Sequence, residues 1–164
     1  QDIDPELSFD AEALLPDRYI HDVGVRLSLY KRLASARDAD DVSELAAEME
    51  DRFGPAPPAA RRYVQLMTLK TDLRRLRVLA CEANAKSVTL HLREDTPIDP
   101  TRLAALLAQS DGRLRLTPDM RLSRRASEGE LFASGIEHCL RLTHEIASAI
   151  SEPRSTAGGH TGDA

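Results

Sequence analysis

The sequence has few aromatic residues. Among its 164 residues, Phe, Trp and Tyr together make up 4%, and tryptophan is absent. Hydrophobic residues still reach 41% and charged residues 30%, the usual balance of a soluble globular protein. This length is enough for one domain with a substantial core. The core must therefore consist mainly of Leu, Val, Ile, Ala and Met.

Cysteine is also scarce. Cys81 and Cys139 are far apart in the chain, and neither has a CxxC partner or a histidine at metal-ligand spacing. Both lie in apolar segments, so buried free thiols are favoured over a disulfide or a metal site. None of the five histidines stands four residues from another, which also argues against a metal site.

Motifs of common catalytic sites are missing. The chain has no GxxxxGK[ST] or GxGxxG phosphate-binding loop, no HExxH metal motif and no GxSxG nucleophile elbow. We therefore expect no catalytic, cofactor-binding or metal-binding residues. No apolar run approaches the roughly 20 residues that span a bilayer, and no signal peptide is recognisable. The expectation is a cytoplasmic protein without a membrane partner.

Charge is distributed unevenly along the chain. The net charge of -5 combines fourteen acidic and six basic residues in positions 1–55, a balance of -8, with thirteen acidic and sixteen basic residues elsewhere, a balance of +3. An acidic leading part does not suit contact with nucleic-acid phosphates. It suits a basic protein partner.

Apolar periodicity predicts an α+β fold. Spacing of three to four residues predicts helices at about 22–36, 39–53, 58–77, 100–110 and 130–150. Alternation predicts strands at 78–83, 87–93, 114–116 and 120–122, and residues 3–9 permit a further short strand. The order indicates a layer of three helices packed with a small antiparallel sheet, a helix between strand pairs and a long C-terminal helix.

The same pattern predicts the domain boundaries. Residues 1–10 suit a segment that leads in from upstream domains, and residues 11–150 form one domain. Residues 151–164 are rich in Gly, Ser, Thr and Pro and are expected to be a disordered tail.

The second helix ends abruptly at Gly54, which a run of prolines follows. Near this end, Glu48, Asp51 and Arg52 share one exposed patch because they stand three and four residues apart. A solvated helix face and a docking site both fit this pattern, and spacing alone favours the solvated face. Phe53 follows the apolar phase and is expected in the core.

Two basic clusters suggest a nucleic-acid alternative. The third helix carries Arg74, Arg75 and Arg77 as candidates for a weak DNA contact. No aromatic stacking partners accompany them and the chain is acidic overall, so a solvated surface is favoured. The second cluster comprises Arg113, Arg115, Arg121, Arg124 and Arg125.

Three stretches resemble a known family. They are DRYI at 17–20, RLSLYKRLASA at 26–36 and EMEDRFGP at 48–55. Together they resemble the C-terminal (TRCF) domain of the bacterial transcription-repair coupling factor, Mfd. The resemblance extends from about residue 7 to residue 125 and is strongest from residue 14 to residue 58.

The resemblance implies a non-catalytic regulatory domain of a DNA-repair protein. In that family the parent is a helicase-like, ATP-driven DNA translocase of transcription-coupled nucleotide excision repair, and upstream motor domains use ATP and Mg. The parent meets RNA polymerase, DNA and UvrA at sites of DNA damage. Its C-terminal domain is autoinhibitory: it packs on the UvrB-like N-terminal module, masks the UvrA-binding surface and restrains the motor.

The resemblance also assigns the docking patch. Transferred by position, it falls on Glu48, Asp51 and Arg52, so the interface becomes favoured over the solvated face. The alternative is a basic DNA-contacting appendage of the same translocase, which would use Arg74, Arg75 and Arg77.

Overall fold

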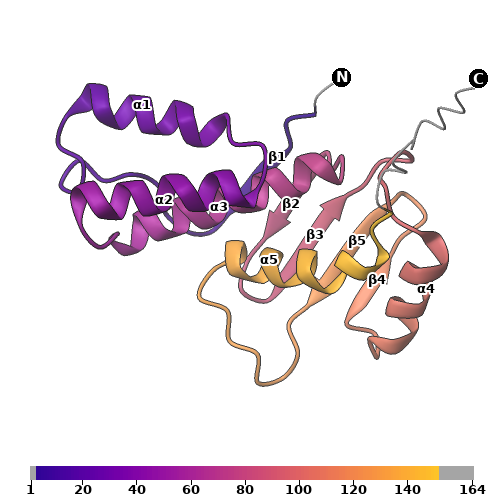
Figure 1. Cartoon of the computed structure of the whole chain (residues 1–164). Helices are drawn as coiled ribbons and strands as arrows, with labels where there is room; N and C mark the ends of the chain where they lie inside the picture. Colours follow the sequence, from indigo (N-terminus) through magenta and orange to yellow (C-terminus); the bar gives the residue numbers. More distant parts are fainter. Residues whose placement is uncertain (1–2, 152–164) are drawn as a thin grey trace, which may run out of the picture.

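A layer of three helices stands beside a five-stranded sheet in the computed structural model, which describes residues 3–151 (Figure 1). The helices of this layer are α1 (Val23–Ala34), α2 (Ala39–Phe53) and α3 (Pro58–Arg75). The strands are β1 (Glu6–Phe9), β2 (Ala80–Ala83), β3 (Ser87–His91), β4 (Leu114–Leu116) and β5 (Arg121–Arg125). The remaining helices are α4 (Pro100–Gln109), α5 (Gly135–Glu145) and the 3-10 turn η1 (Ala147–Ala149). The predicted α+β class is confirmed.

The helices of the first layer begin and end where local chemistry requires. The Asp22 carboxylate accepts a hydrogen bond from a backbone N–H in the first turn of α1, and Asp38 does the same for α2. Gly54 ends α2 with a φ of 84°, a conformation that glycine adopts without strain. Pro58 then occupies the first turn of α3, where its missing N–H costs nothing.

The helical layer has an apolar core of its own. The connector before α1 supplies Leu15 and Ile20, which are buried together with side chains from all three helices. Tyr30 of α1 and Tyr63 of α3 meet edge to face, with ring centroids 5.0 Å apart. The Tyr30 hydroxyl also accepts a hydrogen bond from the backbone N–H of Leu15 at 2.7 Å. The scarce aromatics therefore help to join the connector to the helices.

The strands run in the order β1-β2-β3-β5-β4. All neighbouring pairs are antiparallel except β1 and β2, which are parallel, so the sheet is mixed rather than purely antiparallel. Residues 6–9 fall in the predicted leading segment, and here they add the edge strand β1. The parallel pairing follows from topology, because all three helices of the first layer lie between β1 and β2 and provide the long crossover that it requires.

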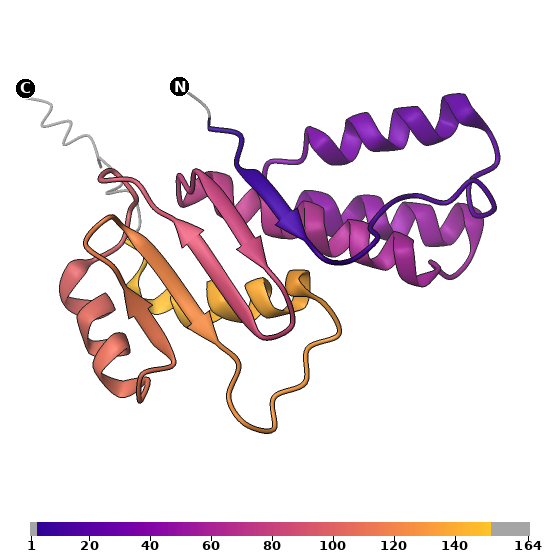
Figure 2. The same ribbon diagram turned by 180° about the vertical axis from the view of Figure 1, so that it is seen from behind.

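Within residues 3–151, helices cover one face of the sheet and leave the other open. Val88, Leu90 and Leu122 lie on the face that packs against α5 and are fully buried. Gly135 lets α5 approach the sheet, because a Cβ atom there would lie 2.3 Å from the carbonyl oxygen of Ala83. Viewed from behind, the opposite face shows the strands with no helix in front of them (Figure 2).

The predicted last helix, 130–150, is too long at both ends. The Ser134 hydroxyl caps α5 by accepting from the N–H of Glu137, and η1 replaces regular helix after Glu145. Phe132 lies in the loop before α5, where its ring stacks on that of His138 with centroids 4.2 Å apart. The helical spacing of apolar residues therefore extends beyond the N-terminal end of α5 into the loop, which made the predicted helix too long. The predicted tail lies outside the described residues apart from Ser151.

No helix between residues 3 and 151 is both long enough and apolar enough to cross a bilayer.

Candidate functional site

The predicted docking patch lies near the C-terminal end of α2, beside α1. The Glu48 carboxylate forms a two-point ion pair with Arg32 of α1, with N–O distances of 2.5 and 3.2 Å. A guanidinium nitrogen of Arg52 lies 4.0 Å from the same carboxylate. All three side chains are between 39% and 46% exposed, so this network lies at the protein surface. Glu48 and Arg52 of this network were predicted from the sequence, whereas Arg32 was not.

The ion pair sets the charge state of the patch. The hydrogen bond from Arg32 lowers the pKa of Glu48 and raises the pKa of Arg32. Both groups are therefore charged across the neutral pH range. Because the pair is exposed, water screens it and its contribution to stability is small. A partner that offers a second guanidinium could thus displace Arg32 at little cost.

Asp51 and Arg52 extend the patch toward the end of the helix. Asp51 is exposed and has no ion-pair partner among residues 3–151. The Arg52 guanidinium stands over the ring of Phe53, 4.9 Å from its centroid. Phe53 packs on the core of the helical layer, as predicted, and meets Tyr19 edge to face. The patch therefore presents both an unpaired carboxylate and a reachable guanidinium.

Tyr19 holds the end of α2 in place. Its hydroxyl donates to the carbonyl oxygen of Gly54 at 2.7 Å, and its ring contacts Phe53. This contact fixes the residue that ends the helix to the connector before α1. The orientation of Asp51 and Arg52 on the last turn is fixed with it.

A groove of about 430 Å³ lies between α1 and α2, next to the patch. Three carboxylates line it, from Asp41, Glu44 and Glu48, against the single guanidinium of Arg32. The groove is therefore acidic, and its chemistry fits basic side chains. The remaining lining residues are Ser35, Ala36 and Leu45.

The three arginines proposed for a weak DNA contact are each held by a carboxylate of the chain. Because each is paired with a different carboxylate, the structure does not bring them together as one unpaired basic patch. The N–O distances are 3.2 Å for Arg74 with Asp4, 3.6 Å for Arg75 with Asp72, and 2.7 Å for Arg77 with Asp95.

A second ionic cluster is buried beneath the sheet, and sequence reasoning did not find it. The Arg124 side chain is only 1% exposed and donates to Glu145 at 2.8 and 3.1 Å and to Glu130 at 2.8 Å. It also donates to Nε2 of His138 at 2.9 Å, while Nδ1 of that ring donates to the carbonyl oxygen of Asn84. This arrangement needs a neutral imidazole, in agreement with the lowered pKa that burial causes for His138.

The buried cluster fixes the loop between β5 and α5. The hydrogen bond from Arg124 lowers the pKa of Glu130 to about 2, and the same carboxylate accepts from the backbone N–H of Ser127. Strand alternation offered one signal, because Arg124 shares the inward side of its strand with Leu122. Its partners come from other elements, so no local pattern reveals them. Because the charges of this cluster are paired with one another, its role is to stabilise the fold.

The two cysteines are buried free thiols, as predicted, although the fold brings them together. The Sγ atoms of Cys81 in β2 and Cys139 in α5 are 3.2 Å apart. The contact with Cys81, together with burial, raises the pKa of the Cys139 thiol. Within the described part of the chain, no group of three or more His, Cys, Asp or Glu side chains is placed to hold a metal ion.

Comparison with known proteins gives the family. The model of the TRCF domain family matches residues 9–103, more than half of the chain. The chain belongs to the TRCF domain family. The resemblance carried by residues 17–20, 26–36 and 48–55 is thereby confirmed.

Relatives of this TRCF domain are transcription-repair-coupling factors. The protein of Myxococcus xanthus is 39% identical over 127 residues, which cover 77% of this chain and 11% of that protein. The protein of Escherichia coli K12 is 34% identical over 117 residues, covering 71% and 10%. The chain therefore spans about a tenth of the length of these relatives.

A solved structure supports the fold of this TRCF domain. The crystal structure of the C-terminal domain of a transcription-repair coupling factor superposes with a TM-score of 0.71 at 19% identity. The superposition covers 91% of this chain and 95% of the other. It shows that the two chains share an α+β architecture.

Proposed function

We propose that this TRCF domain is a non-catalytic, autoinhibitory domain of a transcription-repair coupling factor. It docks through Glu48, Asp51 and Arg52 on a UvrB-like N-terminal module of the same protein. Docking masks the UvrA-binding surface and restrains an ATP-driven DNA translocase. The observation that carries the proposal is the surface network of Arg32, Glu48 and Arg52 beside an acidic groove, in a chain of this family.

The chemistry of the patch suits a reversible contact between domains. Such contacts are more polar than obligate interfaces, and relative motion is their default. Glu48 and Asp51 can accept hydrogen bonds from arginines of the partner, and the guanidinium of Arg52 can donate two parallel hydrogen bonds to a carboxylate. The mixed signs also select for a partner of complementary pattern rather than for any basic surface.

The free energies of releasing Arg32 and of forming new ion pairs suit a reversible contact between domains. Releasing Arg32 from Glu48 costs little free energy, because the pair is exposed. A charge-assisted pair that becomes desolvated on docking contributes about 1–3 kcal/mol. Each such pair therefore shifts the resting equilibrium roughly ten- to hundredfold. Breaking two or three of them would release the domain.

The remaining roles belong to the parent protein and are part of the same proposal. It functions in the cytoplasm in DNA repair, and it meets RNA polymerase, DNA and UvrA. ATP and Mg serve motor domains outside this chain. The relatives of this chain are transcription-repair-coupling factors, which supports a role in DNA repair.

The test is charge reversal in the full-length protein. We expect Glu48→Lys, Asp51→Lys and Arg52→Glu, singly and combined, to raise basal ATPase activity and UvrA binding by up to about tenfold, because like charges then oppose docking. Steady-state ATP hydrolysis and a UvrA pull-down measure the two effects.

Glu50→Lys is the matched control. Glu50 is exposed on the same helix but stands about 160° around it from Glu48, so its reversal should change neither readout. Unchanged ATPase activity and unchanged UvrA binding in the combined variant would refute the proposal. A thermal melt of each variant shows that folding is preserved.

A further inference from the structure

The open face of the sheet carries a group of arginines. Leu114 and Arg124 are cross-strand partners in β4 and β5, and both are buried on the α5 side. Because side chains alternate along a strand, Arg115 and Arg125 point to the opposite, open face, and both are exposed. Arg113 lies beside them, since its carbonyl oxygen accepts a hydrogen bond from the N–H of Arg125 at 3.0 Å. We refer to Arg113, Arg115 and Arg125 as the open-face arginines.

The open-face arginines line one hollow. Its volume is about 350 Å³, and it lies where β4 begins and β5 ends. Asp111 supplies the one carboxylate in the lining, to which Ser110 and Ser127 also belong. Gly112 and Ala126 complete it, so no large apolar or aromatic side chain lines the hollow.

The open-face arginines differ from the other basic clusters because none forms an ion pair within residues 3–151. Arg74 and Arg77 bind carboxylates at the surface, and Arg124 binds two in the interior. In addition, Nε of Arg113 is the one buried side-chain nitrogen or oxygen without a hydrogen-bond partner among the described residues. Such a donor is costly when it lacks an acceptor. The Arg113 guanidinium is therefore incompletely satisfied by the described residues.

We propose that the open-face arginines bind the phosphate backbone of a duplex nucleic acid. Guanidinium groups pair with phosphates through two parallel hydrogen bonds, and such contacts need charge and donors rather than apolar area. The lining lacks the apolar centre of a typical protein interface, which disfavours an acidic protein partner. It also lacks the aromatic platforms on which unpaired bases stack, which disfavours single strands.

The site is separate from the docking patch and from the arginines of α3. It lies on the sheet, whereas Glu48 belongs to the helical layer (Figure 1). Positions 1–55, which contain α1 and α2 but not the basic helix α3, carry a balance of -8. This acidic first part of the chain is therefore less suited to phosphates than the hollow on the sheet. The inference does not depend on autoinhibition.

The test is binding of the whole chain to a labelled DNA duplex, followed by fluorescence anisotropy. Three phosphate contacts give a slope of about -2.7 in log K against log salt, so affinity should fall about 40-fold between roughly 50 and 200 mM salt. Replacing the three by glutamine (R113Q/R115Q/R125Q) should lower low-salt affinity at least tenfold and bring the slope near zero. The lysine triple variant should keep most of the slope, because it keeps the charge.

A matched control removes the same charge elsewhere. Arg18, Arg61 and Arg141 are exposed, lie in different segments and form no ion pair among the described residues, so R18Q/R61Q/R141Q should keep the slope. If burial of Arg113 makes the triple variant unstable in a thermal melt, R115Q/R125Q tests the two exposed members. Two contacts fewer should reduce the slope by about 1.8.

Three results would overturn the inference. The first is no salt-dependent binding by the unmodified chain at about 100 µM, the weak end of non-specific DNA affinity. The second is an equal loss of affinity in the control variant, which would show general electrostatics. The third is displacement of the duplex by polyglutamate as efficiently as by unlabelled duplex, which would indicate an acidic protein surface instead.

Discussion

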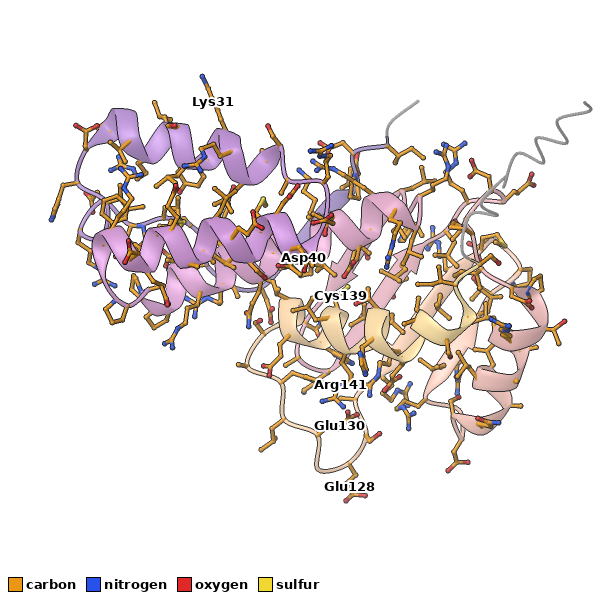
Figure 3. All side chains as sticks on the ribbon, viewed as in Figure 1. Lys31, Asp40, Glu128, Glu130, Cys139 and Arg141 are labelled. Carbon is orange, nitrogen blue, oxygen red and sulfur yellow. The ribbon has the colours of Figure 1, made fainter. Side chains whose placement is uncertain are left out.

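Two ionic clusters with similar chemistry lie in opposite environments in this domain. In the helical layer, Arg32 and Glu48 form a two-point pair at the surface. Behind the sheet, Arg124 forms equivalent contacts with Glu130 and Glu145 while almost completely buried. Figure 3 shows where the two clusters lie. Lys31, the residue before Arg32, is on α1 and points away from the helical layer, and Glu130 lies in the loop below α5.

The difference in burial determines the role that each cluster can have. Water screens the surface pair and can replace either partner, so the pair is suited to exchange its guanidinium for one from another domain. The buried cluster has no such replacement, because a separated charge there would be left without solvent or partner. The first arrangement serves reversible docking. The second fixes the loop between β5 and α5.

The largest effect is expected from breaking the buried cluster. Arg124→Leu leaves Glu130 and Glu145 without their guanidinium, and the free energy of unfolding should fall by about 3–5 kcal/mol. Urea unfolding followed by circular dichroism measures this change. Neutralising both acids in the same background (R124L/E130Q/E145Q) should recover part of the loss. A loss below about 1 kcal/mol in the single variant would show that the burial is not energetically relevant.

An intermediate effect is expected on acidification. The pKa of Glu130 is about 2 in the folded chain, below its ordinary value of 4.5, so its ion pair contributes full stability above about pH 4.5. This contribution is lost as the pH falls from 4.5 toward 2. We therefore expect the stability difference between the unmodified chain and Glu130→Gln to shrink across this window. Unfolding curves at several pH values would show it, and a constant difference would contradict it.

The smallest effect is expected from the surface pair. A double-mutant cycle with Arg32→Ala and Glu48→Ala should give a small coupling energy, well below the loss expected for Arg124→Leu. The coupling should decrease at high salt, because exposed charges are screened. Urea unfolding of the four proteins measures it. A coupling as large as that expected for Arg124 would mean that the pair is too strong to be exchanged on docking.

Most helices and strands follow from local pattern. The three helices of the first layer, α4 and the four strands β2 to β5 were all expected near their observed places, because their apolar periods are regular. The long helix predicted for 130–150 was the main error. Phe132 has helical spacing with Ile136 and Leu140, but in the structure its ring stacks on His138, and Glu130 binds Arg124. A tertiary contact overrode the local period.

The docking patch was predicted in part, and the difference has a physical reason. Helical geometry alone places Glu48, Asp51 and Arg52 on one face, because three- and four-residue steps return to the same side of a helix. Nothing local places Arg32 opposite Glu48, since that contact depends on how α1 packs on α2.

The order of residues sets what depends on neighbours within a few positions. It sets the helix caps at Asp22 and Asp38, the stop at Gly54 and the alternation of Val88 and Leu90. The packing of distant segments sets the remaining features: the parallel pairing of β1, the contact of the two cysteines and the environment of each arginine. A guanidinium has the same charge everywhere. Whether it is buried with carboxylates, paired at the surface or left open on a sheet depends on which elements the fold places beside it.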